Sequence, residues 1–420
     1  LEWSLGKERP EQALRLSTAL GTFWFMHCHW IEGARWFEDT LAMVAEKLTL
    51  SEKIVRARAF YQDAHLAEAL DNIEHMRDSA HASFILCQEG KDRLDLAIAR
   101  YYMGFAFFRI SDYDNALPLL EQSLVEFREL QEPYWEALCQ LRISRARWSG
   151  GDQIYLEVIT HEIELARKTG ERWLLALALE QVFIYAWQNN RLEEANAYIE
   201  EADRLNGEVG YKISLSHLHG MIAHARKDYR RARELYSEAI GTMELMGEKS
   251  TKAAALEYLG LLAKEEGNLT EAQTYVKQAV AISREIGMNQ AIVYRLGLLG
   301  QIHFLQGNLE EAKRDFIESL RIGKSFHLRV VAISFLYICT YLAGLAPRLA
   351  IQILSAIHSY EAKSKSVVAR DPFAKDDFEE TLEQARQALS ESSFQAAWAE
   401  GEQLSIDEVL DLALKTLDQV

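Results

Sequence analysis

The sequence has few of the residues that break helices or staple small domains. Proline occupies only 5 of the 420 positions, and the 4 cysteines form no Cys-x-x-Cys pair. They are Cys28, Cys87, Cys139 and Cys339. Scarce proline permits long helices. The wide cysteine spacing excludes a metal site built on paired thiols, and it indicates reduced, mostly buried side chains in a reducing, cytoplasmic compartment.

Basic residues and long apolar runs are also in short supply. There are 46 Lys and Arg residues against 63 Asp and Glu, which gives a net charge of −17. Phosphate binding needs a basic surface, so we expect no nucleic acid partner. The richest apolar stretch, residues 330–345, is shorter than the roughly 18 residues of a membrane span, so we expect no membrane partner. The chain opens at Leu1 without a signal peptide, and we expect it to be a piece of a longer protein.

The motifs of common catalytic sites are missing. Residues 247–250 read Gly-Glu-Lys-Ser, but Met243 stands where a phosphate-binding loop needs glycine. Histidines pair only at a spacing of two, as in His217 and His219, and a helix sends such residues to different sides. The sequence therefore predicts no catalytic residues, no metal and no cofactor, and the chain is not expected to be an enzyme.

A short phrase ending in alanine recurs along the chain. It reads Gly-Asn-Leu-x-x-Ala in its clearest form. Copies stand at residues 111–116, 190–195, 227–232, 267–272 and 307–312. From Ala195 to Ala350 the reference alanines lie 37, 40, 40 and 38 residues apart. Weaker copies fall near Ala34, Met76 and Tyr155. A period of about 40 residues predicts a repeat array.

Small and large residues alternate in phase with the reference alanine. Twelve residues before it lies a glycine, at Gly104, Gly220, Gly260 and Gly300. Four residues after it lies a larger side chain, at Leu120, Ile199, Tyr236, Val276, Phe316 and Leu354. Such alternation lets paired helices interlock closely. We predict an all-α, right-handed superhelical solenoid of about nine antiparallel helix pairs at residues 1–361. A linker loop at 362–375 and C-terminal capping helices at 376–420 are expected to follow.

These features resemble the tetratricopeptide (TPR) repeat family over about residues 10–360. The lengthened period resembles the sensor arrays of bacterial STAND-type signal-transduction ATPases and of maltose-activator-like transcriptional regulators. Residues 13–42, with Trp24, Gly33 and Trp36, are similar to the segment that enters those arrays, and residues 394–414 to the segment that closes them. The resemblance implies that a nucleotide-binding domain of the parent chain lies upstream.

Helical spacing predicts which side chains line the concave groove of such an array. Positions 15, 11, 8 and 7 residues before the reference alanine fall on the inner face of the first helix of each pair. The predicted groove residues are Tyr101, Phe105, Arg109, Gln140, Arg147, Trp148, Glu180, Trp187, His217, His224, Glu257 and Tyr294. Aromatic side chains beside hydrogen-bonding groups are typical of a recognition surface.

Three functions remain open at this point. The first is a non-catalytic sensor module that binds a protein, a peptide or a small-molecule inducer in the groove and biases the upstream domain. The second is a scaffold that docks protein segments without switching. The third is a repeat domain similar to peptide-pheromone receptors, which also use lengthened repeats.

Overall fold

The chain is described by a computed structural model that covers residues 10–43, 49–90, 92–150, 156–211, 215–326, 328–364 and 375–419. Within these ranges it forms 21 helices and no strand. The first are α2 (Pro10–Met26), α3 (Trp30–Leu41), α4 (Leu50–Ala69), α5 (Ile73–Gly90), α6 (Arg93–Arg109), α7 (Tyr113–Glu129), α8 (Pro133–Ser149), α9 (Leu156–Thr169), α10 (Arg172–Gln188) and α11 (Leu192–Val209). Next come α12 (Ser216–Ala225), α13 (Tyr229–Met246), α14 (Ser250–Glu265), α15 (Leu269–Glu285), α16 (Asn289–Leu305), α17 (Leu309–Gly323), α18 (Leu328–Leu345) and α19 (Pro347–Ser364). The last are α20 (Lys375–Gln387), α21 (Glu391–Gly401) and α22 (Ile406–Gln419).

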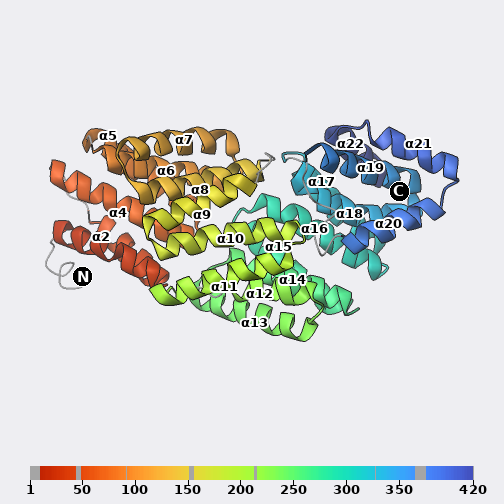
Figure 1. Cartoon of the computed structure of the whole chain (residues 1–420), viewed down its shortest axis with the longest axis horizontal. Helices are drawn as coiled ribbons and strands as arrows, with labels where there is room; N and C mark the ends of the chain where they lie inside the picture. Colours follow the sequence, from red (N-terminus) through yellow and green to blue (C-terminus); the bar gives the residue numbers. More distant parts are fainter. Residues whose placement is uncertain are drawn as a thin grey trace.

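Successive helices pack against each other as an all-helical solenoid, and the two ends of the chain lie at opposite ends of its long axis (Figure 1). The strongest contacts join α4 with α5, α6 with α7, α10 with α11, α14 with α15 and α16 with α17. Pair turns fall where the recurring phrase predicts them, at residues 110–112, 189–191, 226–228, 266–268 and 306–308. The predicted copy near Tyr155 lies outside the described residues, and the exact number of pairs stays a prediction.

The recurring phrase ends one helix and begins the next. Its first residue has a left-handed backbone, with φ of 79° at Gly267 and 66° at Ser111. Glycine adopts this conformation without a steric penalty, and it ends the preceding helix. The next residue caps the following helix, because the Asp112 carboxylate accepts a hydrogen bond from the Asn115 amide at 3.2 Å and Asp228 caps α13 in the same way. The phrase therefore fixes the turn inside each pair.

The glycines of the repeat are points of close helix approach. A Cβ atom added at Gly220 would lie 2.5 Å from the Tyr236 ring, and one at Gly300 would lie 2.5 Å from the Phe316 ring. Gly104 meets Leu120 and Gly260 meets Val276 in the same manner. The large residue four positions after the reference alanine thus fills the space that glycine leaves. This confirms the packing that the sequence pattern predicts.

The solenoid winds tightly enough for its successive turns to touch. Asp71, in the turn between α4 and α5, contacts the amides of Lys249 and Ser250, which are 178 and 179 residues further along the chain. Tyr113 and Gln290, 177 residues apart, are also hydrogen-bonded. One superhelical turn therefore takes about 178 residues, and it brings the start of α14 onto the α4–α5 turn.

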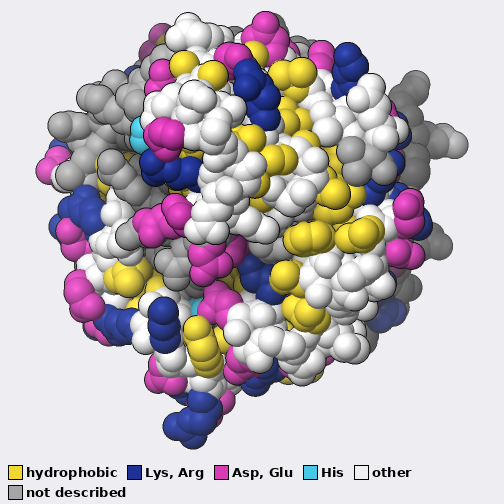
Figure 2. Space-filling view, turned by 90° about the vertical axis from the view of Figure 1, so that its right-hand side faces the viewer, with side chains coloured by type: hydrophobic (Ala, Val, Ile, Leu, Met, Phe, Trp, Pro, Cys, Tyr) yellow, Lys and Arg dark blue, Asp and Glu magenta, His cyan; other side chains and the backbone are white. Residues whose placement is uncertain are grey.

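Two large hydrophobic cores meet at α14. The first runs from Leu14 to Leu262 and the second from Leu261 to Leu417. Helices α20, α21 and α22 pack on α18, α19 and α17. The face at this end of the molecule mixes acidic, basic and hydrophobic side chains (Figure 2). Helix α19 extends to Ser364, and the predicted loop at 365–374 lies outside the described residues.

Cys87, Cys139 and Cys339 are buried free thiols and Cys28 is half-buried, in agreement with the expectation of mostly buried cysteines. None of the described helices is both long and apolar enough to cross a membrane. In the part of the chain that the structure describes, no group of three or more His, Cys, Asp or Glu side chains gathers as a metal site would require.

Candidate functional site

The winding of the solenoid leaves an interior cavity of about 380 Å³ that is partly open to solvent. Its wall is built from every second helix from α6 to α16, with further residues from α4 and α7. These are the first helices of successive pairs, so one face of each helix points inward. The cavity falls within the size range of pockets that hold small ligands.

One part of the wall is apolar and aromatic. It consists of Phe105, Phe108, Leu177, Ile184 and Met288. The rings of Phe105 and Phe108 stack with their centroids 5.6 Å apart. The guanidinium of Arg142 lies 4.1 Å from the centroid of the Phe105 ring, within the range of a cation–π contact.

Two of the three arginines in the wall have carboxylate partners. Arg109 forms an ion pair with the buried carboxylate of Asp71. Arg142 pairs with Glu68 at 3.2 Å, and it also donates a hydrogen bond to the Tyr101 hydroxyl at 3.3 Å. The charges of these two side chains are therefore compensated within the protein.

Arg145, one turn after Arg142 on α8, is different. Within the described ranges its guanidinium has no hydrogen bond and no ion pair, and it lies over the Trp148 ring at 4.9 Å. Burial, and next the neighbouring charge of Arg142, lower the pKa of Arg145. Burying a cation without an anionic partner is costly, so an anion placed near Arg145 would be stabilising.

Two more polar groups of the wall lack partners. The buried Nε2 of Gln181 on α10 and the buried Nδ1 of His217 on α12 form no hydrogen bond with any described residue. Burial, and next the neighbouring His219, lower the pKa of His217 to about 4, so its ring is neutral near pH 7. Buried polar groups are nearly always hydrogen-bonded in native proteins, so these two nitrogens are exceptions that lie behind the surface of the wall.

Glu180 completes the polar part of the wall. Burial raises the pKa of its carboxyl to about 7. The side chain is therefore close to half protonated at neutral pH. The cavity wall thus carries one uncompensated guanidinium and one carboxyl that is ready to lose or gain a proton.

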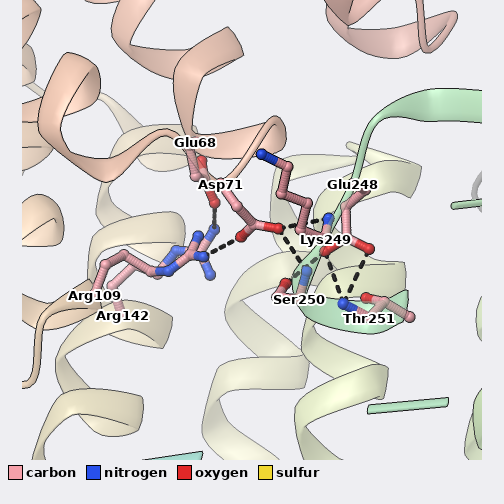
Figure 3. A network of polar contacts seen from close by, with 8 residues as sticks. All are labelled: Glu68, Asp71, Arg109, Arg142, Glu248, Lys249, Ser250 and Thr251. Atoms are coloured by element: carbon pink, nitrogen blue, oxygen red, sulfur yellow. Dashed lines mark hydrogen bonds and ion pairs between the residues drawn. The ribbon is translucent and has the colours of Figure 1, made fainter. Parts of the chain in front are cut away.

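A network of polar contacts closes the superhelical turn beside the cavity (Figure 3). The Asp71 carboxylate accepts hydrogen bonds from the Lys249 amide at 2.9 Å and the Ser250 amide at 2.6 Å, which are unsatisfied donors at the start of α14. Glu248 accepts from the Thr251 amide at 2.9 Å. We call Asp71, Arg109, Glu248, Lys249 and Ser250 the clasp. Burial, and next the charge of Asp71, raise the pKa of Glu248 to about 7.

The clasp arises from one altered copy of the repeat. Asp71 occupies the first position of the weak copy at residues 71–76, and its φ of 55° matches the left-handed backbone of that position elsewhere. Asn72 follows as the helix cap, accepting from the His75 amide at 3.3 Å. Because this left-handed residue has a carboxylate, its side chain can reach the next superhelical turn.

A second hollow, of about 780 Å³, lies outside the superhelical turn between α3 and the end of α13. Its wall includes Trp30, Ile31, Trp36, Leu245 and Met246. Leu245 is 87% exposed and Ile31 is 58% exposed, so this hollow is open to solvent. No unpartnered buried polar atom is known in its wall. The interior cavity is therefore the stronger candidate site.

The structure brings four of the predicted groove residues together in the cavity wall. They are Phe105, Arg109, Glu180 and His217. Tyr101, Trp187 and His224 are instead buried within the helix packing, each at most 2% exposed. These three side chains therefore do not line the cavity as predicted. The first helices are buried on more than one face, so helical spacing alone does not separate residues that face the cavity from residues that face the core.

The residues that line the cavity from α8 are not the ones that the helical spacing predicts. Arg147 pairs with Glu121 of α7 at 2.6 Å and is half exposed, so it does not line the cavity. Trp148 lies beneath Arg145, and Gln140 accepts a long hydrogen bond from Arg128 at 3.5 Å. The residues that do line the cavity from this helix are Arg142, Arg145 and Ser149. A reference position two residues after Tyr155 would have found Arg142 and Ser149.

The predicted residues of the later pairs lie outside the cavity. Glu257 pairs with the buried Arg295 at 2.7 Å, and Tyr294 lies against the same guanidinium. Only the N-terminal ends of α14 and α16 reach the cavity, through Ser250 and Gln290. Sequence reasoning missed these two residues because the closure of the superhelical turn leaves no local pattern.

The arrangement of helices matches solved structures of tetratricopeptide-type repeat proteins. A Rap protein in complex with competence and sporulation factor is 12% identical, with 75% of this chain and 98% of that chain covered and a TM-score of 0.53. The apo form of the quorum sensor NprR from B. thuringiensis is 15% identical, with 73% and 86% covered and a TM-score of 0.50. A STAND protein with a tetratricopeptide repeat sensor from Pyrococcus horikoshii is 12% identical, with 92% and 67% covered and a TM-score of 0.47; nothing below depends on it.

No protein-family model and no curated protein matches the sequence. At these identities the likeness to solved structures concerns the fold alone. The chain is a TPR-like helical repeat array.

Proposed function

We propose that this chain is a non-catalytic sensor module that binds a small molecule or a short peptide segment in the interior cavity. The observation that carries the proposal is the cavity wall itself. Arg145 lines the cavity with a guanidinium that has no ion pair and no hydrogen bond among the described residues, and it lies beside the apolar side chains of the same wall. A ligand that supplies a partner would recover the free energy that the burial of this guanidinium costs.

The folds of the similar repeat proteins are compatible with this function. One was solved in complex with competence and sporulation factor, and another is described as a quorum sensor. The proposal extends the same kind of function, recognition of a small signal by a helical repeat array, to this chain. In the parent protein, the bound state would bias an upstream nucleotide-binding domain, as the sequence resemblance to signal-transduction ATPases and transcription regulators suggests.

The cavity and the clasp share residues, which gives occupancy a way to act on the superhelix. Arg109 lines the cavity and pairs with Asp71, and Ser250 lines it while its amide donates to the same carboxylate. A ligand that contacts Arg109 or Ser250 only when the turn is closed binds that state better. By mass action it then shifts the population toward the closed turn.

A docking scaffold is the second candidate. The exposed apolar side chains of Ile31 and Leu245 around the open hollow favour it, because contiguous apolar surface often marks a protein contact. A scaffold of this kind would bind its partner outside the superhelical turn. Its binding would therefore be independent of the interior cavity.

The proposal is tested by titrating the protein with dansylamide, an uncharged fluorescent aromatic probe. We expect saturable binding of one probe per chain. Ile184→Trp fills the apolar part of the cavity and should abolish this binding, while Leu245→Trp, which adds the same side chain at the open hollow, should leave it unchanged. Absence of saturable binding, or its loss in Leu245→Trp alone, would refute an interior ligand site.

A further inference from the structure

The three arginines of the cavity wall differ in how their charges are balanced. Arg109 and Arg142 have Asp71 and Glu68 as partners, whereas Arg145 lies over the Trp148 ring and has no carboxylate partner among the described residues. Full exposure does not explain the difference, because Arg145 is partly buried and lines the cavity. The cavity wall therefore has one guanidinium whose charge no described carboxylate balances.

Other donors lie in the same wall. Gln181 Nε2 can only donate a hydrogen bond, and the neutral imidazole of His217 can donate from Nδ1 in one of its tautomers. These groups come from α10 and α12, next to α8 in the order of first helices. Both nitrogens are fully buried behind the wall, so Arg145 is the donor considered for a ligand in the cavity.

The geometry points to a carboxylate of a small, otherwise apolar ligand as the anion that Arg145 binds. This assignment rests on the proposed function. The planar guanidinium matches a carboxylate through two parallel hydrogen bonds. The rest of the ligand would lie against Phe105, Phe108 and Ile184.

The charge balance favours a monoanion over a phosphate group. Only one guanidinium is uncompensated, and the carboxyl groups of Glu68 and Glu180 share the cavity wall. A dianion would leave excess negative charge near these carboxyls in a space of low dielectric, where repulsion between like charges is strong. A single carboxylate neutralises Arg145 without that excess.

The test compares dansylglycine, which carries a carboxylate, with dansylamide, which has the same aromatic frame without charge. We expect the full chain to bind dansylglycine at least tenfold more tightly than dansylamide, the scale of a charged hydrogen bond. Arg145→Met keeps the apolar stem over Trp148 and should remove this preference without weakening dansylamide. Arg145→Lys, which keeps the charge but not the planar fork, should retain part of it.

Arg147→Met is the matched control, because this arginine lies two residues further along α8 and pairs with Glu121 outside the cavity. It should leave the affinity for both probes unchanged. Hippurate, a carboxylate, should displace dansylglycine at lower concentration than phenyl phosphate; the reverse order would overturn the choice of a monoanion.

Different results would refute the carboxylate site and the interior ligand site. If both probes bind in an Ile184-dependent manner but Arg145→Met does not change their relative affinity, the carboxylate site is refuted and the interior ligand site stands. If neither probe binds, the interior site itself is refuted. Retention of the folded state in each variant is checked by its thermal midpoint and helical circular dichroism.

Discussion

The carboxylate of Asp71 accepts a hydrogen bond from the amide of Ser250 at 2.6 Å, although 179 residues separate them in the chain. Asp71 also pairs with Arg109, so one buried side chain connects the α4–α5 turn, the end of α6 and the start of α14. Repeat proteins are stabilised mainly by contacts between neighbouring repeats. This clasp is a contact between distant repeats, and it lies beside the interior cavity.

Asp71→Asn should destabilise the protein. The substitution keeps the size and the left-handed backbone tolerance of the side chain but removes the charge that compensates the largely buried Arg109. We expect the free energy of unfolding to fall by about 1–3 kcal/mol, the cost of a buried charged group that loses its partner. Urea denaturation measures the change.

The control for this variant is Glu121→Gln, which removes the charge of an ion pair whose side chains are each about half exposed. Exposed pairs contribute little, so the change should stay below about 0.5 kcal/mol. A double-mutant cycle of Asp71→Asn with Arg109→Met should give a clear coupling energy. Additive effects would show that the clasp is not an energetic unit.

Glu180→Gln should alter how stability depends on pH. Burial raises the pKa of Glu180 to about 7 in the folded protein, above the ordinary value of 4.5. The folded state therefore holds a proton that the unfolded state has lost, and the stability from this group falls as pH rises from about 4.5 through 7. Glutamine has no proton to lose, so the variant should gain stability relative to wild type by about 1–3 kcal/mol between pH 5 and pH 8.

Thermal or urea unfolding at several pH values measures this difference. Glu193→Gln, at a carboxylate whose side chain is 86% exposed, is the control and should show a flat difference across the same range. A flat difference for Glu180→Gln as well would mean that the carboxyl is not buried in the folded protein.

Gly300→Ala should test the close approach of paired helices. A Cβ at this position would lie 2.5 Å from the buried Phe316 ring, which cannot move without displacing its neighbours. We expect overpacking to lower the free energy of unfolding by about 1–3 kcal/mol. Gly241→Ala, within α13 and with no atom near the added Cβ, should instead stabilise by about 0.4–1 kcal/mol through helix propensity. Equal effects of the two substitutions would contradict the packing account.

The isolated chain should have no ATPase activity. Residues 247–250 resemble part of a phosphate-binding loop, but they form the turn into α14, and the Ser250 amide is occupied by Asp71. Incubation with ATP and magnesium should release no phosphate above a buffer control. Release that follows the protein through purification and disappears in Lys249→Ala would contradict this prediction.

The repeat and its turns could be predicted from the sequence because they depend on local chemistry. A left-handed residue such as Gly267, followed by a capping residue such as Asn268, gives the same turn wherever it occurs. Glu180 and His217 are each counted from a clear reference alanine, Ala195 or Ala232, and the structure places both in the cavity wall, while their role in binding stays a prediction. Local patterns therefore gave the fold and part of the cavity wall.

The clasp and the rest of the wall could not be predicted in this way. The number of residues in a superhelical turn is the sum of small rotations between repeats, and no single motif encodes it. Arg145 was missed because the copy near Tyr155 is degenerate, so the phase of α8 had no fixed reference. Asp71 was missed because its partners at the start of α14 lie 178 and 179 residues away.

A ligand inside the cavity is proposed to stabilise the closed superhelical turn, in which Asp71 contacts the amides of Lys249 and Ser250. The most direct measurement is amide hydrogen exchange of the segment that holds Lys249 and Ser250, with and without saturating dansylglycine. The account predicts slower exchange of these amides in the presence of the probe in wild type, and no change in Ile184→Trp. Exchange that stays the same in wild type while the probe is bound, or that slows equally in Ile184→Trp, would contradict the claim.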